Sequence, residues 1–186
     1  LFTGFQYGEA GRQIYDFFWS DFADWYLEIA KLQMQNPDTR YTTADTLARV
    51  LDTSLRLLHP FTPFVTEELW GHLRETILES PISALAEDWS DVLITAKWPE
   101  ERDPEGWEDK VLEDFSKEQE IIRAIRNARA EKNIKPSVRF IPTLVTKDDY
   151  DLFTTDSGVI ASLSGTHLPE LFTDYTVESE NHMVIV

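Results

Sequence analysis

Apolar residues recur at intervals of three and four along much of this 186-residue chain, and this spacing is typical of one face of an α-helix. Four such stretches cover residues 10–34, 42–58, 63–78 and 104–133. In the first stretch, apolar side chains share one face and polar side chains occupy the other. The second opens on Thr42 and Thr43, which we read as a start resembling a capping box. The pattern predicts a helical bundle over residues 1–136.

The pattern changes after Pro136. Residues 138–146 alternate as a strand does, and Pro142 within them indicates a sheet edge or a bulge. Residues 148–163 then predict a helix, and residues 175–177 and 183–186 predict the two arms of a hairpin. We therefore expect a mainly α fold, in which a small α/β module of βαββ type at 137–186 follows the bundle and is truncated at its C-terminal end. Residues 79–104 predict a long loop or a single short strand around 92–94.

The corner between the second and third helices has a specific helix-start pattern. Pro60 cannot continue a helix, Thr62 can act as the N-cap, and Pro63 fits the first helical position, where its missing N–H costs nothing. Phe64 and Trp70 follow as large apolar residues. We expect both to be buried at this corner.

Composition and charge exclude several classes of protein. The 17 basic and 34 acidic residues give a formal charge of −17, which argues against wrapping a nucleic acid by bulk electrostatics. The charge is uneven, however, because residues 121–139 contain six basic residues and one acidic residue. Any contact with a polyanion should be confined to that run. The absence of Cys excludes disulfides and thiol catalysis. We expect no membrane span, because no apolar run is long enough.

Known signatures of catalytic and metal sites are absent from the sequence. The four His residues show no ligand spacing, and there is neither a nucleophile elbow nor a phosphate-cradling glycine loop. We therefore expect no catalytic residue, no metal ligand and no cofactor site within this chain.

Three segments at 17–28, 59–70 and 125–137 occur in a characteristic order. Together they resemble the anticodon-binding domain of class I aminoacyl-tRNA synthetases. The run Asp24-Trp25-Tyr26-Leu27-Glu28 and the run Arg129-Ala130-Glu131 favour the valyl branch over the leucyl and isoleucyl branches. Lys97-Trp98-Pro99 is similar to the Trp-Pro that precedes the last long helix in that group. The resemblance extends over nearly the whole chain.

The resemblance implies a cytoplasmic, monomeric parent enzyme that joins valine to tRNA(Val) with ATP and Mg²⁺, using catalytic and editing domains of the same chain. The family's His-Ile-Gly-His and Lys-Met-Ser-Lys-Ser type motifs do not occur here. Because the chain opens at Leu1 without Met and stops at Val186, we expect it to be a fragment. It would dock tRNA and leave the chemistry to the absent domains.

Two sets of residues are candidates for tRNA contact. Leu27 could seat an anticodon base, with Lys31 one turn on reaching the backbone; the alternative is that Leu27 packs against a helix upstream of Leu1. In the basic run, the candidates for phosphate binding are Arg123, Arg129, Lys132 and Lys135. The alternative here is structural, with Arg126 and Arg129 pairing with carboxylates and holding the bundle to the small module.

Two other identities fit parts of the same pattern. One is the equivalent domain of an isoleucyl-type synthetase, against which the run Asp24-Trp25-Tyr26-Leu27-Glu28 argues. The other is a non-enzymatic helical scaffold for protein–protein contacts, for which a charge of −17 would be ordinary. Selective binding of one tRNA would distinguish the anticodon-binding domain from the scaffold.

Overall fold

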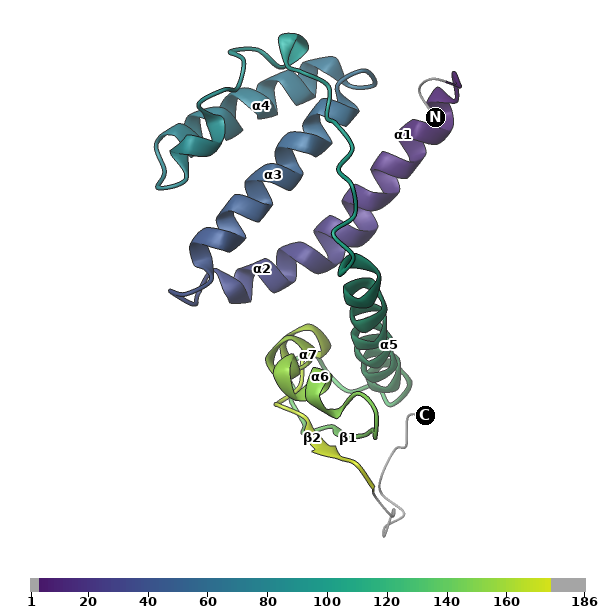
Figure 1. Ribbon diagram of the computed structural model, residues 1–186. Helices are drawn as coiled ribbons and strands as arrows, with labels where there is room; N and C mark the ends of the chain where they lie inside the picture. The colour runs from purple at the N-terminus through teal and green to yellow at the C-terminus, as the bar shows by residue number, and fades with distance from the viewer. Residues whose placement is uncertain (1–3, 175–186) are drawn as a thin grey trace. The chain divides into compact units, whose positions relative to one another are not determined.

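The computed structural model describes residues 4–174 of the chain (Figure 1). Contacts divide the chain into two compact units, Leu1–Arg102 and Asp103–Val186. We call them unit 1 and unit 2 and describe each by itself. The described part of the chain is mainly helical, which confirms the fold class expected from the sequence.

Unit 1 opens with a long helical rod that contains a π-helical segment. Its parts are α1 (Tyr7–Asp16), the π-helix η1 (Phe17–Tyr26) and α2 (Leu27–Gln33). The backbone keeps right-handed helical angles through both junctions, so the rod is continuous. Phe22 and Trp25 of η1 are buried, as the apolar spacing predicted. The sequence predicted the helix but not its i→i+5 hydrogen bonding, which places more residues in each turn.

Two helices, α3 (Arg40–Leu58) and α4 (Pro63–Leu78), follow the rod (Figure 1). The predicted start of α4 at Pro63 is confirmed, with Thr62 at the N-cap position, although the Thr62 side chain makes no capping hydrogen bond. The predicted start of the earlier helix at Thr42 or Thr43 is wrong, because α3 begins at Arg40. Thr39, which precedes it, donates its hydroxyl hydrogen bond back to the Gln33 carbonyl at 2.7 Å. The Thr39 side chain makes no capping hydrogen bond to α3, so the expected capping box is not formed.

The corner between α3 and α4 buries only one of the two aromatic residues expected there. Trp70 is 0% exposed, whereas Phe64 is 91% exposed, so the expectation for Phe64 was wrong. The two residues are six positions apart, which at about 100° per residue places them about 120° apart around α4. Phe64 therefore points away from the face that Trp70 buries.

Residues 79–104 form the expected long loop, which contains two short 3₁₀ turns, η2 (Ser83–Ala86) and η3 (Leu93–Thr95), and the alternative of a short strand around 92–94 is wrong. The Trp89 ring stacks on Trp70 at a centroid distance of 4.8 Å, and Leu93 is buried in the same cluster. The Glu67 carboxylate fixes η3 by accepting hydrogen bonds from the backbone N–H groups of Leu93 at 2.7 Å and Ile94 at 3.2 Å. This carboxylate caps the first amides of the turn, so the segment does not extend as a strand.

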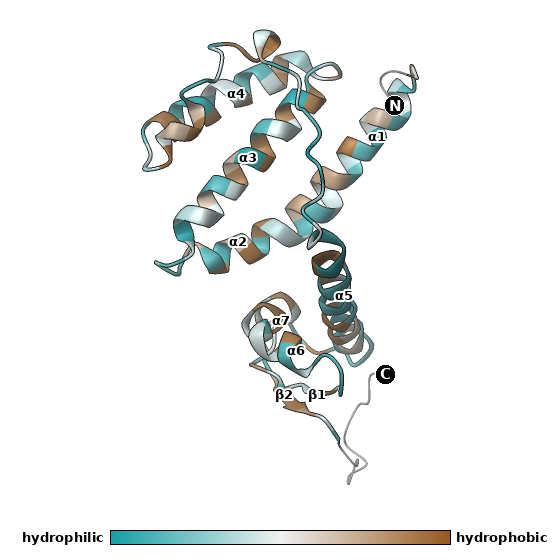
Figure 2. Cartoon of the chain, in the orientation of Figure 1, coloured by the Kyte–Doolittle hydropathy of each residue, from teal (hydrophilic) through white to brown (hydrophobic). Residues whose placement is uncertain are grey.

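Unit 2 combines one long helix with a small α/β module. Its elements are α5 (Glu108–Glu131), β1 (Thr143–Val145), α6 (Tyr150–Thr155), α7 (Ser157–Ser164) and β2 (Glu170–Phe172). β1 and β2 pair in parallel, with Leu144 opposite Leu171. Ile122 and Ile125 of α5 and Ile160 of α7 form the buried side of the unit. Figure 2 shows that α7 is predominantly hydrophobic.

The contact-based division at 102/103 differs from the boundary at 136/137 expected from the sequence. The difference arises because α5 packs on α7, so the long helix is grouped with the small module. The grouping of residues 1–136 as one functional domain stays a prediction. Within the module, the strand is shorter than the expected 138–146, and the expected helix 148–163 is interrupted at Asp156. The predicted hairpin at 175–177 and 183–186 lies outside the described residues.

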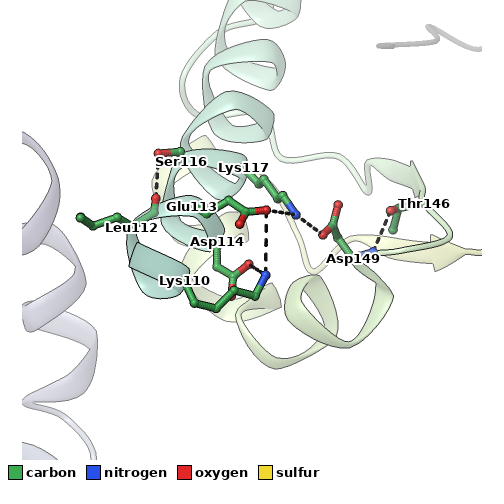
Figure 3. Close-up of polar contacts among 8 residues, drawn as sticks. All are labelled: Lys110, Leu112, Glu113, Asp114, Ser116, Lys117, Thr146 and Asp149. Atoms are coloured by element: carbon green, nitrogen blue, oxygen red, sulfur yellow. Dashed lines mark hydrogen bonds and ion pairs between the residues drawn. The ribbon is translucent and has the colours of Figure 1, made fainter. Parts of the chain in front are cut away.

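A small network of charged groups joins α5 to the start of α6 (Figure 3). The Lys117 ammonium lies 2.7 Å from the Asp149 carboxylate and 3.2 Å from the Glu113 carboxylate. These two hydrogen-bonded carboxylates raise the pKa of Lys117. Asp149 is the N-cap residue of α6, and its backbone N–H donates to the Thr146 hydroxyl at 3.3 Å. The network thereby fixes the turn that leads from β1 into α6.

Candidate nucleic-acid interface

The first candidate contact lies on the rod of unit 1, where η1 passes into α2. Leu27 is half-buried and Lys31 is exposed, and their separation of four residues places them on the same side of α2. The Lys31 ammonium lies 2.5 Å from the Glu28 carboxylate. An exposed ion pair of this kind contributes at most about 1 kcal/mol, so a phosphate can compete for the ammonium. Ala30 of the same helix is 2% exposed and belongs to the core.

The second candidate contact is the basic run of unit 2. Arg123, Lys132 and Lys135 are all exposed. Arg123 donates to the Gln119 side chain at 3.5 Å, and Lys132 is the C-cap residue of α5. Nine residues at about 100° each place Arg123 and Lys132 on opposite sides of the helix. The run therefore provides two separate points of positive charge, one on the flank of α5 and one at its C-terminal end with Lys132 and Lys135.

Arg129 is a structural residue of unit 2. Its side chain is buried, with the residue 8% exposed, and its guanidinium donates to the carbonyl oxygens of Gly165, Lys135 and Val138 at 2.8, 3.0 and 3.1 Å. The guanidinium also lies 5.5 Å from the centre of the Phe140 ring. These contacts use the side chain inside the fold, so we leave Arg129 out of the proposed contact surface.

Arg126 has a related role, because its Nε donates to the Leu163 carbonyl oxygen at 2.8 Å. In the structural alternative for Arg126 and Arg129, both side chains pair with carboxylates. The Arg126 Nε and Arg129 Nη1 hydrogen bonds go to backbone carbonyl oxygens around the C-terminal end of α7. The C-terminal end of a helix carries partial negative charge, which favours cations at this place.

A groove in unit 1 was not anticipated from the sequence. It lies between the rod, α3 and residues 97–102, has a volume of about 710 Å³, and includes four basic and two acidic residues in its lining. Its basic residues are Arg49, Arg56, Lys97 and Arg102. They are scattered over 54 positions of an acidic chain, so no local charge run signals them. The Lys97-Trp98-Pro99 motif was the only available signal for this groove.

Unit 2 also contains a buried carboxyl group, which lies away from any surface that a nucleic acid could contact. Glu118 of α5 is 7% exposed. Burial, together with charge repulsion from Asp156 and Asp114 and hydrogen bonding to Asp156, raises the pKa of Glu118 to about 8. The raised pKa favours the protonated, neutral form of this side chain. Within residues 4–174, no group of three or more candidate ligands could hold a metal ion. Nor is any helix of the described chain both long and apolar enough to cross a membrane.

Comparisons with known proteins assign this chain to a family. The family model "Anticodon-binding domain of tRNA ligase" matches residues 1–144, so the chain belongs to the anticodon-binding domain family of tRNA ligases. Among curated relatives, the valine–tRNA ligase of Geobacillus stearothermophilus is 39% identical over 148 residues, 78% of this chain and 15% of the relative. That of Bacillus licheniformis is 41% identical over 131 residues, 69% of this chain and 13% of the relative.

A third relative is similar over a longer part of the chain. The valine–tRNA ligase of Pseudothermotoga lettingae is 37% identical over 167 residues, which cover 88% of this chain and 17% of the relative. The chain thus spans about 15% of the length of the curated relatives it matches. The resemblance seen in the sequence is confirmed at the level of the family and of its valine–tRNA ligase members.

Proposed function

We propose that this chain is the tRNA-docking region of a valine–tRNA ligase. The observation that carries the proposal is the match of residues 1–144 to the anticodon-binding family, together with identities of 37–41% to valine–tRNA ligases. In this proposal the chain holds tRNA(Val), while catalytic and editing domains of the same parent protein use ATP and Mg²⁺ to attach valine. The parent works in the cytoplasm as a monomer.

The contacts in this proposal come from both units. Leu27 provides an apolar seat for an unstacked anticodon base, and Lys31 pairs with the adjoining phosphate. Arg123, Lys132 and Lys135 provide charge for phosphates of the stem. Because the whole chain carries a charge of −17, these local cations must supply the attraction. Binding should therefore weaken as salt rises.

A competition experiment tests this function. A labelled transcript of tRNA(Val) is bound to the chain and displaced by two unlabelled transcripts, one unchanged and one with an altered anticodon. We expect the unchanged transcript to displace the label at a lower concentration. Equal displacement by both transcripts would contradict anticodon recognition and would favour a non-specific or scaffold role.

A separate experiment tests whether the activation chemistry resides outside this chain. It measures the valine-dependent exchange of pyrophosphate into ATP. We expect the parent enzyme to catalyse exchange and this chain to catalyse none, because its sequence lacks the two family motifs for ATP and amino-acid activation. Exchange by the purified chain would contradict the proposal that the chemistry resides in other domains.

A further inference from the structure

Trp98 lines two hollows of unit 1 that differ in chemistry. One is an open hollow of about 490 Å³ lined by Tyr7, Pro60, Phe61 and Trp98, and its surface is almost entirely apolar. The other is the groove of about 710 Å³ that includes four basic residues and is also lined by Trp98. Trp98 is 49% exposed, so its indole is accessible from solvent. One aromatic side chain thus belongs to both an apolar seat and a cationic groove.

The basic residues of the groove have different roles. The Arg56 side chain is only 14% exposed: it pairs with Asp52 at 2.7 Å, donates to the Lys97 carbonyl oxygen at 2.8 Å and lies 4.6 Å from the centre of the Trp70 ring. Arg56 therefore anchors the loop segment that carries Trp98. Arg49, with a side chain 52% exposed, pairs with Asp45 at 2.7 Å, an exposed ion pair for which a phosphate can compete, and Lys97 and Arg102 are exposed cations.

The net charge of the groove lining is positive, whereas the net charge of the whole chain is negative. Four basic and two acidic residues line it, whereas the whole sequence has twice as many acidic as basic residues. One of the two acids, Asp52, is held against Arg56, and burial raises the pKa of its carboxyl group. A groove with this balance complements an anionic occupant better than a basic or neutral one.

We propose that this groove binds one unpaired nucleotide of RNA, with its base against Trp98 in the apolar hollow and its phosphate among Arg49, Lys97 and Arg102. Stacking of a base on an aromatic side chain next to a cationic path for the backbone is how proteins hold single-stranded RNA. This site is separate from Leu27 and from the basic run of unit 2. The inference rests on the proposed function, because it takes the RNA to be the tRNA that the chain docks.

The test is the binding of labelled tRNA(Val) to the chain carrying Trp98→Ala or Arg102→Glu. Trp107→Ala and Lys147→Glu serve as matched controls, because both positions are exposed and lie outside the groove. We expect the Kd to rise about tenfold for Trp98→Ala, the effect of losing one stacked base, and to be restored by Trp98→Phe. Arg102→Glu should raise the Kd and reduce its dependence on salt, while both controls leave the Kd within about twofold.

The outcomes separate failure of this inference from failure of the proposed function. If the unaltered chain does not bind tRNA, the proposed function fails and the inference fails with it. If the unaltered chain binds tRNA and both groove variants bind equally well, the groove is not an RNA site and the proposed function stands. A lower melting temperature for Trp98→Ala with unchanged tRNA binding by Arg102→Glu would instead assign the groove to packing against another protein segment, which also overturns the inference.

Discussion

Arg129 and Gly165 are joined by a hydrogen bond of 2.8 Å between the arginine Nη1 and the glycine carbonyl oxygen, although 36 residues separate them. Gly165 ends α7 in the left-handed conformation, with φ of 71°, which glycine adopts without steric cost. A positively charged side chain thus binds the C-terminal end of a helix from a neighbouring element. The contact connects α5 to α7 and stabilises unit 2.

Replacing Arg129 by Ala should destabilise unit 2 by about 3 kcal/mol, because three carbonyl oxygens lose a charged donor at a buried site. Unfolding in denaturant measures the loss. Arg123→Ala is the control and should stay within about 0.5 kcal/mol of the unaltered chain, since that residue is exposed. Equal stability of the Arg129 and Arg123 variants would show that the carbonyl contacts do not stabilise the unit.

Trp70→Ala and Phe64→Ala form a matched pair of aromatic truncations on α4. The first should cost about 3–5 kcal/mol of unfolding free energy, because Trp70 is fully buried and contacts both Trp89 and Arg56. The second should cost less than about 0.5 kcal/mol, because Phe64 is 91% exposed. Thermal melts of the two variants provide the comparison. A larger loss for Phe64 than for Trp70 would mean that the corner packs differently.

Stability should depend on pH through Glu118, whose pKa in the fold is raised to about 8. The folded chain then holds a proton that the unfolded chain releases at lower pH, so this group lowers the free energy of unfolding as the pH rises from about 4.5 to 8. The slope from one proton is at most about 1.4 kcal/mol per pH unit. Glu118→Gln should flatten the profile in that range.

Glu120→Gln is the control for this profile, because Glu120 is exposed on the same helix. Denaturant unfolding at several pH values should give the same slope for this control as for the unaltered chain. A Glu118→Gln variant with an unchanged slope would show that Glu118 is ionised in the folded state at neutral pH.

Leu27→Ala distinguishes a base seat from a packing role. As a base seat, the half-buried Leu27 should affect the preference between tRNA transcripts with matched and altered anticodons, with little change in melting temperature. Leu32→Ala, at a half-buried position that we expect on the apolar face of the rod, should lower the melting temperature and leave the preference intact. A stability loss above about 2 kcal/mol for Leu27→Ala, with unaltered preference, would assign Leu27 to packing.

Local sequence patterns predicted the helices well, because the apolar spacing and the end signals of a helix lie within or next to that helix. The start of α4 at Pro63 followed from the conformational limits of one residue, and the apolar spacing gave the extent of the rod. The π-helical segment was missed because a 100° rotation per residue was assumed throughout. The burial of Phe64 was misjudged because hydrophobicity alone does not say which way a side chain points.

Contacts between residues far apart in the sequence could not be predicted from local patterns. The bonds from Arg129 to Gly165 and from Glu67 to Leu93 join residues 36 and 26 positions apart, and no spacing rule connects them. The groove around Trp98 likewise brings Arg49 and Arg102 together from distant parts of the sequence. A charge run at 121–139 was visible in the sequence, but only the structure divides it into internal and exposed side chains.

The most direct test of the central claim is the affinity of this chain for tRNA(Val) at several salt concentrations, before and after single charge reversals. Lys132→Glu, Lys135→Glu and Arg123→Glu are each compared with Lys147→Glu, an exposed reversal outside the proposed surface. We predict that the unaltered chain binds tRNA(Val) and that each of the three reversals weakens binding and lowers the slope of log K against log salt by about one. Absence of binding by the unaltered chain, or equal binding by all four variants across the salt series, would contradict the account.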